Sequence, residues 1–362
     1  MDALSYFATD YAAARAKFLE AARSAGARLA SHRNPALGPG GLELTTEVAA
    51  LGPAGAHTTL WINSGTHGGE GFFGSALQVG WLRGPGLRAL PQGVQVLLVH
   101  AINPYGFAWL RRTNEHNVDL NRNFVAHGNA YPENPGYAEL HPAILPEAWT
   151  PETQAAFRQA YRAYAEAEGE MAAQAAITAG QYDVAEGLFY GGRGESWSNR
   201  LVQAIAREHC EGERTVFIDL HTGLGSWGHF EIIHQQVPDG PGEAWLQRWL
   251  GTHSLGSLAR GDSVSVASAG ALIENGVRRG LGGRQLVAAT LEVGTRPVPA
   301  VLEALRADNW LHVHGELESE QGRAIKAQLA DAFCPGEPDW KELVALRGRQ
   351  ILDASLAGAA AR

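Results

Sequence analysis

The chain has 362 residues, with 29 Lys and Arg against 38 Asp and Glu, so its formal net charge at pH 7 is −9. This acidic balance argues against a nucleic-acid partner, because binding to a phosphate backbone relies on clustered basic side chains. Hydrophobic residues make up 45% of the sequence and charged residues 19%, which is enough apolar material for a large core. We therefore expect a globular protein that does not bind nucleic acid.

The start of the chain and its cysteines indicate where the protein works. The first residues, MDALSYFATDYAAARAKF, lack the basic segment, the continuous apolar run and the cleavage site of a signal peptide, and no apolar run approaches membrane-spanning length. Cys210 and Cys334 are too few for a disulfide framework. We expect a cytoplasmic protein with two reduced thiols and no membrane partner.

Taken in chain order, the hydrophobic pattern predicts alternating helices and strands. Helices are expected at 4–25, 72–82, 154–179, 198–208, 299–316, 318–332 and 339–357. Strands are expected at 42–48, 58–63, 94–100, 216–220 and 286–292. The segment 126–149 is dense in Pro, Asn and Gly and predicts a long loop.

These elements favour one catalytic domain that spans residues 1–362. Within it we expect an amino-terminal helix at about 4–25, a core at about 40–316 and a carboxyl-terminal helical extension at about 318–357.

Several apolar strands end at polar residues that suit metal chemistry. The strand at 58–63 runs into a glycine-rich turn that carries His67 and Glu70, while His221 and Glu292 end the strands at 216–220 and 286–292. A catalytic zinc site takes three ligands from His, Asp and Glu and keeps a fourth position for water. His67 and Glu70 can reach one ion across their turn, and His221 is the candidate third ligand. A lone H-x-x-E motif is also common at surfaces and helix caps, so the other motifs of the sequence determine whether it is interpreted as a metal site.

That context is a series of separated motifs in a fixed order. They are His67-Gly68-Gly69-Glu70, Arg112-Thr113-Asn114, Asp119-Leu120-Asn121-Arg122-Asn123, Asp219-Leu220-His221-Thr222-Gly223 and Leu291-Glu292-Val293-Gly294-Thr295. The order resembles the M14 family of zinc carboxypeptidases, and the run 65–72 is similar to its DUF2817 branch, which is related to aspartoacylase and succinylglutamate desuccinylase. The resemblance spans roughly residues 60–296. It implies a three-layer α/β/α sandwich around a mixed sheet, with the metal at the carboxyl edge of the strands.

The resemblance also implies a metal site. His67, Glu70 and His221 would hold one Zn²⁺ per chain, and Asp119 would receive the other ring N–H of His67. Glu292 would act as the general base that takes a proton from water and passes it to the leaving amine. Taken alone, Asp119 could be a turn or cap residue and Glu292 a buried structural residue at a strand end.

The remaining matched residues would handle the substrate. Arg112 would face the scissile carbonyl and stabilise charge on its oxygen, although the sequence leaves open whether its neighbour Arg111 does so. Asn121 and Arg122 would bind a terminal carboxylate, unless they form a surface salt bridge instead.

The implied activity is zinc-dependent hydrolysis of an amide bond next to a free carboxylate, with a small peptide as substrate. An N-acyl-amino-acid deacylase of the aspartoacylase type is the alternative, and an inactive metal- or peptide-binding scaffold is a third hypothesis.

The chain departs from the family at one point. M14 carboxypeptidases usually carry a mobile tyrosine between the third ligand and the glutamate, whereas no Tyr lies between His221 and Glu292. The candidate replacements are Trp227, His229, His234, Arg278 and Tyr190. The glycine-rich segment 188–194 lacks a nucleotide-binding arrangement and is interpreted as a turn that borders the pocket.

Overall fold

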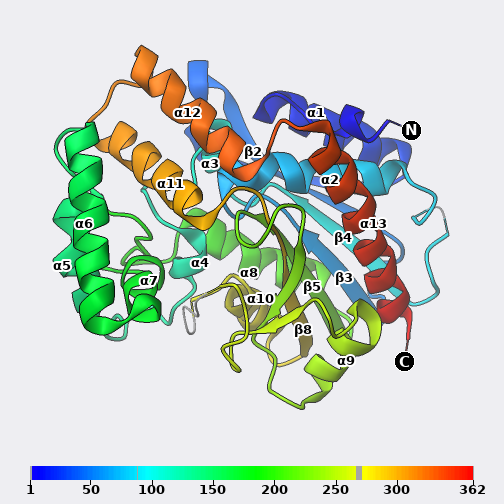
Figure 1. The fold of residues 1–362 in the computed structure, drawn as a ribbon. Coiled ribbons are helices and arrows are strands. Elements are labelled where there is room, and N and C mark those ends of the chain that lie inside the picture. The colour runs from blue at the N-terminus through cyan, green and yellow to red at the C-terminus, as the bar shows by residue number, and fades with distance from the viewer. Residues whose placement is uncertain (1, 88, 266–270, 362) are drawn as a thin grey trace.

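A mixed eight-stranded sheet forms the centre of the computed structural model, which describes residues 2–87, 89–265 and 271–361 (Figure 1). Its strands are β1 (Arg28–Leu37), β2 (Glu43–Leu51), β3 (Thr58–Asn63), β4 (Val94–His100), β5 (Arg214–Thr222), β6 (Phe230–His234), β7 (Leu255–Ser257) and β8 (Gln285–Val293). Their order is β1-β2-β4-β3-β5-β8-β6-β7. The four central strands β4, β3, β5 and β8 are parallel, and β2 and β6 pair with them in antiparallel fashion.

Both faces of the central strands are buried, which explains their nearly continuous apolar sequences. On β3, Leu60 and Ile62 belong to one hydrophobic cluster while Trp61 belongs to the cluster on the opposite face. The same alternation occurs on β4 and β5, because successive side chains of a strand point to opposite faces.

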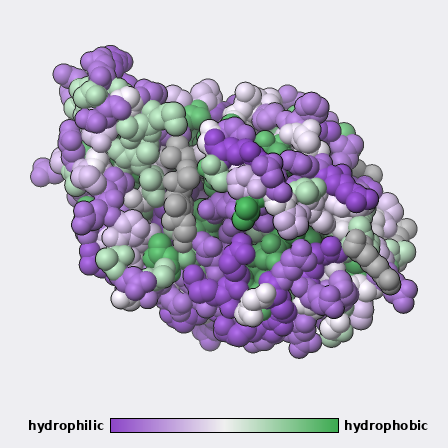
Figure 2. Space-filling model, turned by 90° about the horizontal axis from the view of Figure 1, so that it is seen from below, coloured by the Kyte–Doolittle hydropathy of each residue, from purple (hydrophilic) through white to green (hydrophobic). Residues whose placement is uncertain are grey.

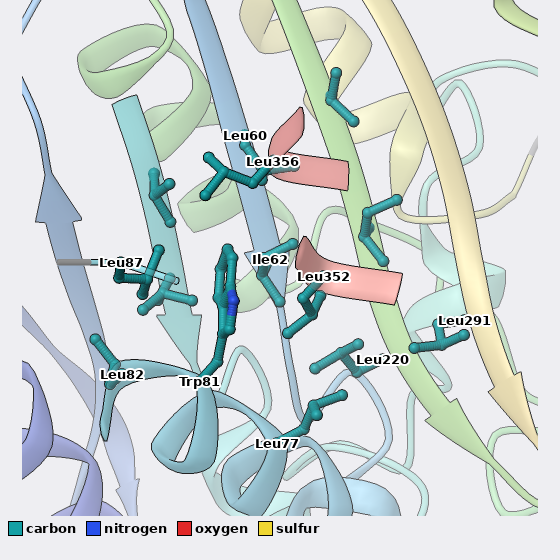
Figure 3. Close-up of a cluster of buried hydrophobic side chains, with 14 of the residues drawn as sticks. Leu60, Ile62, Leu77, Trp81, Leu82, Leu87, Leu220, Leu291, Leu352 and Leu356 are labelled. Atoms are coloured by element: carbon teal, nitrogen blue, oxygen red, sulfur yellow. The ribbon is translucent and has the colours of Figure 1, made fainter. Parts of the chain in front are cut away.

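Helices cover each face of the sheet. One layer comprises α1 (Tyr11–Ser24), α2 (Gly71–Arg83), α9 (Pro241–Leu250) and α13 (Pro338–Ala360). Figure 3 shows its interior, where leucines of α2 and α13 and Trp81 meet Leu60, Ile62, Leu220 and Leu291 of the sheet. The other layer comprises α4 (Leu120–Asn123), α8 (Trp197–His209) and α10 (Glu274–Leu281). Together these layers confirm the predicted α/β/α sandwich.

A further group of helices lies beside the sheet, in green and orange in Figure 1. It comprises α5 (Pro135–Ile144), α6 (Pro151–Glu168), α7 (Glu170–Thr178), α11 (Val298–Val313) and α12 (Glu320–Phe333). These helices share a hydrophobic cluster of their own, which includes Phe157, Ile177, Phe189 and Leu305. We call α5, α6 and α7 the side helices.

The expected helices differ from the observed ones in three places. The helix predicted at 4–25 is divided into a 3-10 turn at Ala3–Tyr6 and α1, because Asp10 accepts a hydrogen bond from the Ala13 N–H and caps α1. The helix predicted at 154–179 is interrupted at Gly169, whose φ of 94° is not helical. The loop predicted at 126–149 contains α5, which Asn134 caps and which begins at Pro135.

The sequence reasoning also missed β1, β6, β7, α9 and α10. Of these, β1 and β7 are the edge strands of the sheet, and β6, β7 and α10 have only five, three and eight residues.

The outer surface is mostly hydrophilic on the face shown in Figure 2, where apolar residues gather in separate groups. Among the described residues, no helix combines the length and apolar character needed to cross a membrane.

Candidate metal centre

Three adjacent parallel strands bring the candidate residues to one edge of the sheet. β3 leads through a turn to His67 and Glu70, β5 carries His221 and β8 carries Glu292. His221 and Glu292 are direct partners in the β5–β8 register. This is the carboxyl edge of the strands, where open α/β sheets bind their ligands.

A close backbone contact places the first two residues. The 3-10 turn η3 (Gly68–Glu70) packs on the short helix α3 (Pro104–Ala108). A Cβ atom at Gly68 would lie 1.8 Å from the Gly106 carbonyl carbon, so only glycine allows this approach. The tight contact fixes the turn that has His67 at its start and Glu70 at its end.

The three candidate ligands converge on a single point. Glu70 lies between the histidines, with His67 Nδ1 at 2.8 Å from its Oε1 and His221 Nδ1 at 2.8 Å from its Oε2. The ligand atoms of the three residues all lie within 4.8 Å of one another, and the three side chains are buried. Two imidazoles and a carboxylate form a donor set typical of catalytic zinc.

The second ring nitrogen of each histidine faces another carboxylate. His67 Nε2 lies 3.1 Å from Asp119 Oδ1, and His221 Nε2 lies 2.6 Å from Asp219 Oδ2. Asp219 also accepts hydrogen bonds from Asn63 and Thr66. These carboxylates favour the tautomer in which each Nδ1 lone pair points to the common centre. Asp219 was not predicted, although its position two residues before His221 places it on the same strand face.

The charges of this cluster suit a divalent cation. Burial raises the pKa of Glu70, but His67 and His221 outweigh it and hold that pKa well below its ordinary value. Burial lowers the pKa of His221, whereas Asp219 and Glu70 raise it well above the ordinary value overall. Three buried carboxylates thus surround two imidazoles, and a dication at the centre would balance their negative charge.

Glu292 is placed next to these ligands. It is buried, it lines the same cavity, and its Oε1 accepts a hydrogen bond of 2.9 Å from the Leu224 N–H. Burial, and then the Glu70 carboxylate, raise the pKa of Glu292 to about 8. A cation held by the neighbouring residues would favour the ionised form of this carboxylate.

Arg112 and Arg111 point to different places. Arg112 lines the cavity, donates to Asp119 Oδ2 at 2.7 Å, and its Nη1 lies 3.7 Å from Glu70 Oε1. Arg111 donates to Asn117 at 2.9 Å and lies 3.8 Å from Asp308 on α11, and it is not among the described residues that line the cavity. Of the two arginines, the structure therefore brings Arg112 to the candidate metal centre.

Asn121 and Arg122 also line the cavity, where other residues hold them in place. The Asn121 Oδ1 accepts from the Ile273 N–H at 3.0 Å. Arg122 donates through Nε and Nη2 to the carbonyl oxygen of Thr178, at the end of α7. The Phe189 ring lies near both guanidinium groups, 4.9 Å from Arg112 Cζ and 5.5 Å from Arg122 Cζ.

The cavity has a volume of about 780 Å³ and extends well beyond the metal centre. Its outer wall comes from α6, α7 and α11, for which the sequence reasoning assigned no function. None of Trp227, His229, His234, Arg278 and Tyr190 is among the described lining residues. Tyr161 on α6 is the one tyrosine among them. The turn at 188–194 does border the cavity, through Phe189.

The fold and this site together define an α/β protein with a His–Glu–His centre at the carboxyl edge of its sheet. The chain belongs to the family described as "Protein of unknown function (DUF2817)", which it matches over residues 7–347. Membership of this family confirms the resemblance seen in the motifs. The comparison with curated proteins finds no match.

Solved structures resemble the chain at low sequence identity. The thrombin activatable fibrinolysis inhibitor has a TM-score of 0.50 at 10% identity, over 97% of this chain and 74% of that one, and shares its fold. The carboxypeptidase A from Helicoverpa armigera gives 0.42 at 12% identity, over 90% and 74% of the two chains. The succinylglutamate desuccinylase from Chromobacterium violaceum gives 0.36 at 15% identity, over 89% and 74%.

Proposed function

We propose that the protein is a zinc-dependent M14-type hydrolase that cleaves an amide bond next to a free carboxylate in small peptides. The observation that carries this proposal is the convergence of His67, Glu70 and His221 within 4.8 Å. Glu292 and Arg112 lie on the same cavity, so a base and a cation are both available beside the ligands.

Each residue has a distinct chemical task in this reaction. A zinc ion held by His67, Glu70 and His221 supplies Lewis acidity and makes water a stronger acid. The Glu292 carboxylate accepts the proton of the attacking water and returns it to the leaving amine. Arg112, oriented by its hydrogen bond to Asp119, donates to the oxygen on which negative charge develops.

Asn121 and Arg122 would bind the free carboxylate of the substrate. Arg122 directs Nε and Nη2 to Thr178 and Nη1 to the Asn121 carbonyl, which fixes the plane of its guanidinium group. A guanidinium held in this way presents its remaining N–H groups in one orientation, which suits a planar carboxylate.

One observation favours the alternative of an N-acyl-amino-acid deacylase. Arg112 and Arg122 both lie against Phe189 near the metal centre, and two cations this close suit a small substrate with two carboxylates. An inactive scaffold has less support, because the base Glu292 and the cation Arg112 are both in place beside the ligands.

Metal analysis combined with a hydrolysis screen tests the proposal. The purified protein would be assayed for zinc and then incubated with short peptides and N-acyl amino acids, with and without a chelator, and the products identified by mass spectrometry. We expect about one zinc per chain and chelator-sensitive release of a carboxyl-terminal residue. Release of an acyl group alone would favour the deacylase. A protein that stays inactive after zinc is added would refute both hydrolase hypotheses and favour the inactive binding scaffold.

A further inference from the structure

We propose that α6 and α7 form an outer binding site that holds the amino-terminal part of a peptide and selects an acidic side chain there. This inference rests on the proposed hydrolase function, since it names the substrate class of the same cavity. It assigns a role to the side helices, which the residues at the metal centre do not require.

The length of the cavity favours an oligopeptide. Residues of α7 line it at helical spacing from Glu170 to Thr178, whose carbonyl oxygen accepts hydrogen bonds from Arg122. At about 1.5 Å per residue, this stretch of helix is about 12 Å long. An extended peptide covers about 3.3–3.6 Å per residue, so three to four residues would span it. The cavity volume of about 780 Å³ also lies in the upper part of the range of about 300–1,000 Å³ for drug-sized ligands.

Two arginines on α6 supply unpaired positive charge. Arg158 and Arg162 both line the cavity and lie one helical turn apart. Neither forms a hydrogen bond or an ion pair within the described part of the chain. Like charges at this spacing destabilise a helix slightly, so the pair does not serve the stability of α6. Their charges remain available to an anionic group of a ligand.

A third cation lies across the same wall. Arg306 of α11 is only 1% exposed and packs on the ring of Phe157, 3.5 Å from its centroid. Its hydrogen bonds go to the carbonyl oxygens of Ala143 and Ile144 and to the side chain of Gln154. Among the described residues no carboxylate forms an ion pair with it, although burial lowers its pKa and Glu303 of the same helix raises it, so its charge adds to the field of the two α6 arginines.

Carboxylates on the same wall restrict where an acidic side chain of the peptide can bind. Glu170 accepts a hydrogen bond of 2.8 Å from the Tyr161 hydroxyl, and Glu166 lies one turn beyond Arg162 on α6. Glu303 faces the cavity from α11. An acidic side chain of a peptide is repelled by these groups and attracted by the arginines, so its position along the wall is restricted.

Peptides that differ in length and charge test the outer site. Two pentapeptides would share their last two residues and carry either Glu or Lys at the third and fourth positions from the carboxyl terminus. An N-blocked dipeptide with the same last two residues reaches only the metal centre. The kcat/KM values would be measured for the parent, for the double variant R158Q/R162Q, and for R207Q, which removes an exposed arginine of α8 outside the cavity.

We expect the parent to prefer the Glu peptide, and the double variant to lose about fivefold in kcat/KM on that peptide. Hydrolysis of the blocked dipeptide should be unchanged, R207Q should match the parent, and the preference should weaken as salt is added. Equal rates on the Glu and Lys peptides in the parent, or an equal loss on the dipeptide, would overturn the proposal.

A binding measurement separates this inference from the proposed function. The affinity of the Glu peptide for Glu292→Gln would be measured by calorimetry, with and without the two arginine substitutions. Arginine-dependent binding to this variant, together with a parent protein that hydrolyses neither the pentapeptides nor the dipeptide, would refute the hydrolase and support the outer site. If the parent hydrolyses the dipeptide and the two arginine substitutions do not change peptide affinity, the outer site is refuted and the hydrolase is supported.

Discussion

Replacement of Phe189 tests the packing that supports the two arginines of the cavity. Phe189 is 4% exposed and has a φ of 53°, in the left-handed region that bulky residues rarely adopt. This conformation costs a non-glycine residue about 1–2 kcal/mol. The ring that it positions contacts both guanidinium groups, with Arg112 Cζ 4.9 Å and Arg122 Cζ 5.5 Å from its centroid.

Two substitutions at this position separate the ring from the backbone. Phe189→Ala removes the buried ring and keeps the unfavourable backbone conformation, so we expect a loss of about 3–5 kcal/mol in unfolding free energy. Phe189→Gly removes the same ring but relieves about 1–2 kcal/mol of backbone strain. Glycine also gains about 0.4–1 kcal/mol of entropy in the unfolded chain, which offsets part of that relief. The glycine variant should therefore be about 0.5–1 kcal/mol more stable than the alanine variant.

Urea denaturation followed by tryptophan fluorescence would measure the difference, with both variants compared under the same metal conditions. A protein with glycine at a given position is usually less stable than the same protein with alanine there, so the order expected at position 189 is the reverse of the usual one. An alanine variant at least as stable as the glycine variant would refute the strained conformation. Both variants should also raise KM, because Arg112 and Arg122 lose the ring that both of them contact.

Four further outcomes are expected at the metal centre. Glu292→Gln, which can still accept the Leu224 N–H, should keep its zinc while kcat falls by about 10²–10⁴; parental activity would remove its role as base. His221→Ala should lose both zinc and hydrolysis, as metal analysis and the peptide assay would show. Gly68→Ala should lower the thermal midpoint and the zinc content together, because its Cβ would lie 1.8 Å from a backbone carbon. Saturation with zinc at about a thousand times its Kd should raise the midpoint of the chelator-treated protein by about 5 °C by calorimetry.

The strand ends are the part of the site that the sequence predicts well. β3, β5 and β8 are buried on both faces, so their apolar runs are easy to recognise and the polar residues that follow them stand out. Parallel pairing then places His67, His221 and Glu292 at one edge without further information.

The outer wall could not be predicted in the same way. Residues of α6 such as Tyr161 and Arg162 have the ordinary composition of an exposed helix, and no local pattern shows that this helix stands over the sheet edge. Their position depends on packing between α5, α6, α7 and α11, which joins segments more than a hundred residues apart. The choice between Arg111 and Arg112 also depends on their partners: Arg111 lies near Asp308 of the distant helix α11, whereas Arg112 donates to Asp119, seven residues further along the chain.

Asp119 connects the separate tasks of the proposed site. One of its oxygens faces His67 and accepts the Asn121 N–H, while the other accepts from Arg112. Arg112 and His67 hold the pKa of this buried carboxyl well below its ordinary value, against the effect of burial, so it remains an anion. The proposed metal ligand His67, the proposed oxyanion cation Arg112 and the start of α4, which carries Arg122, are thus oriented by one charge.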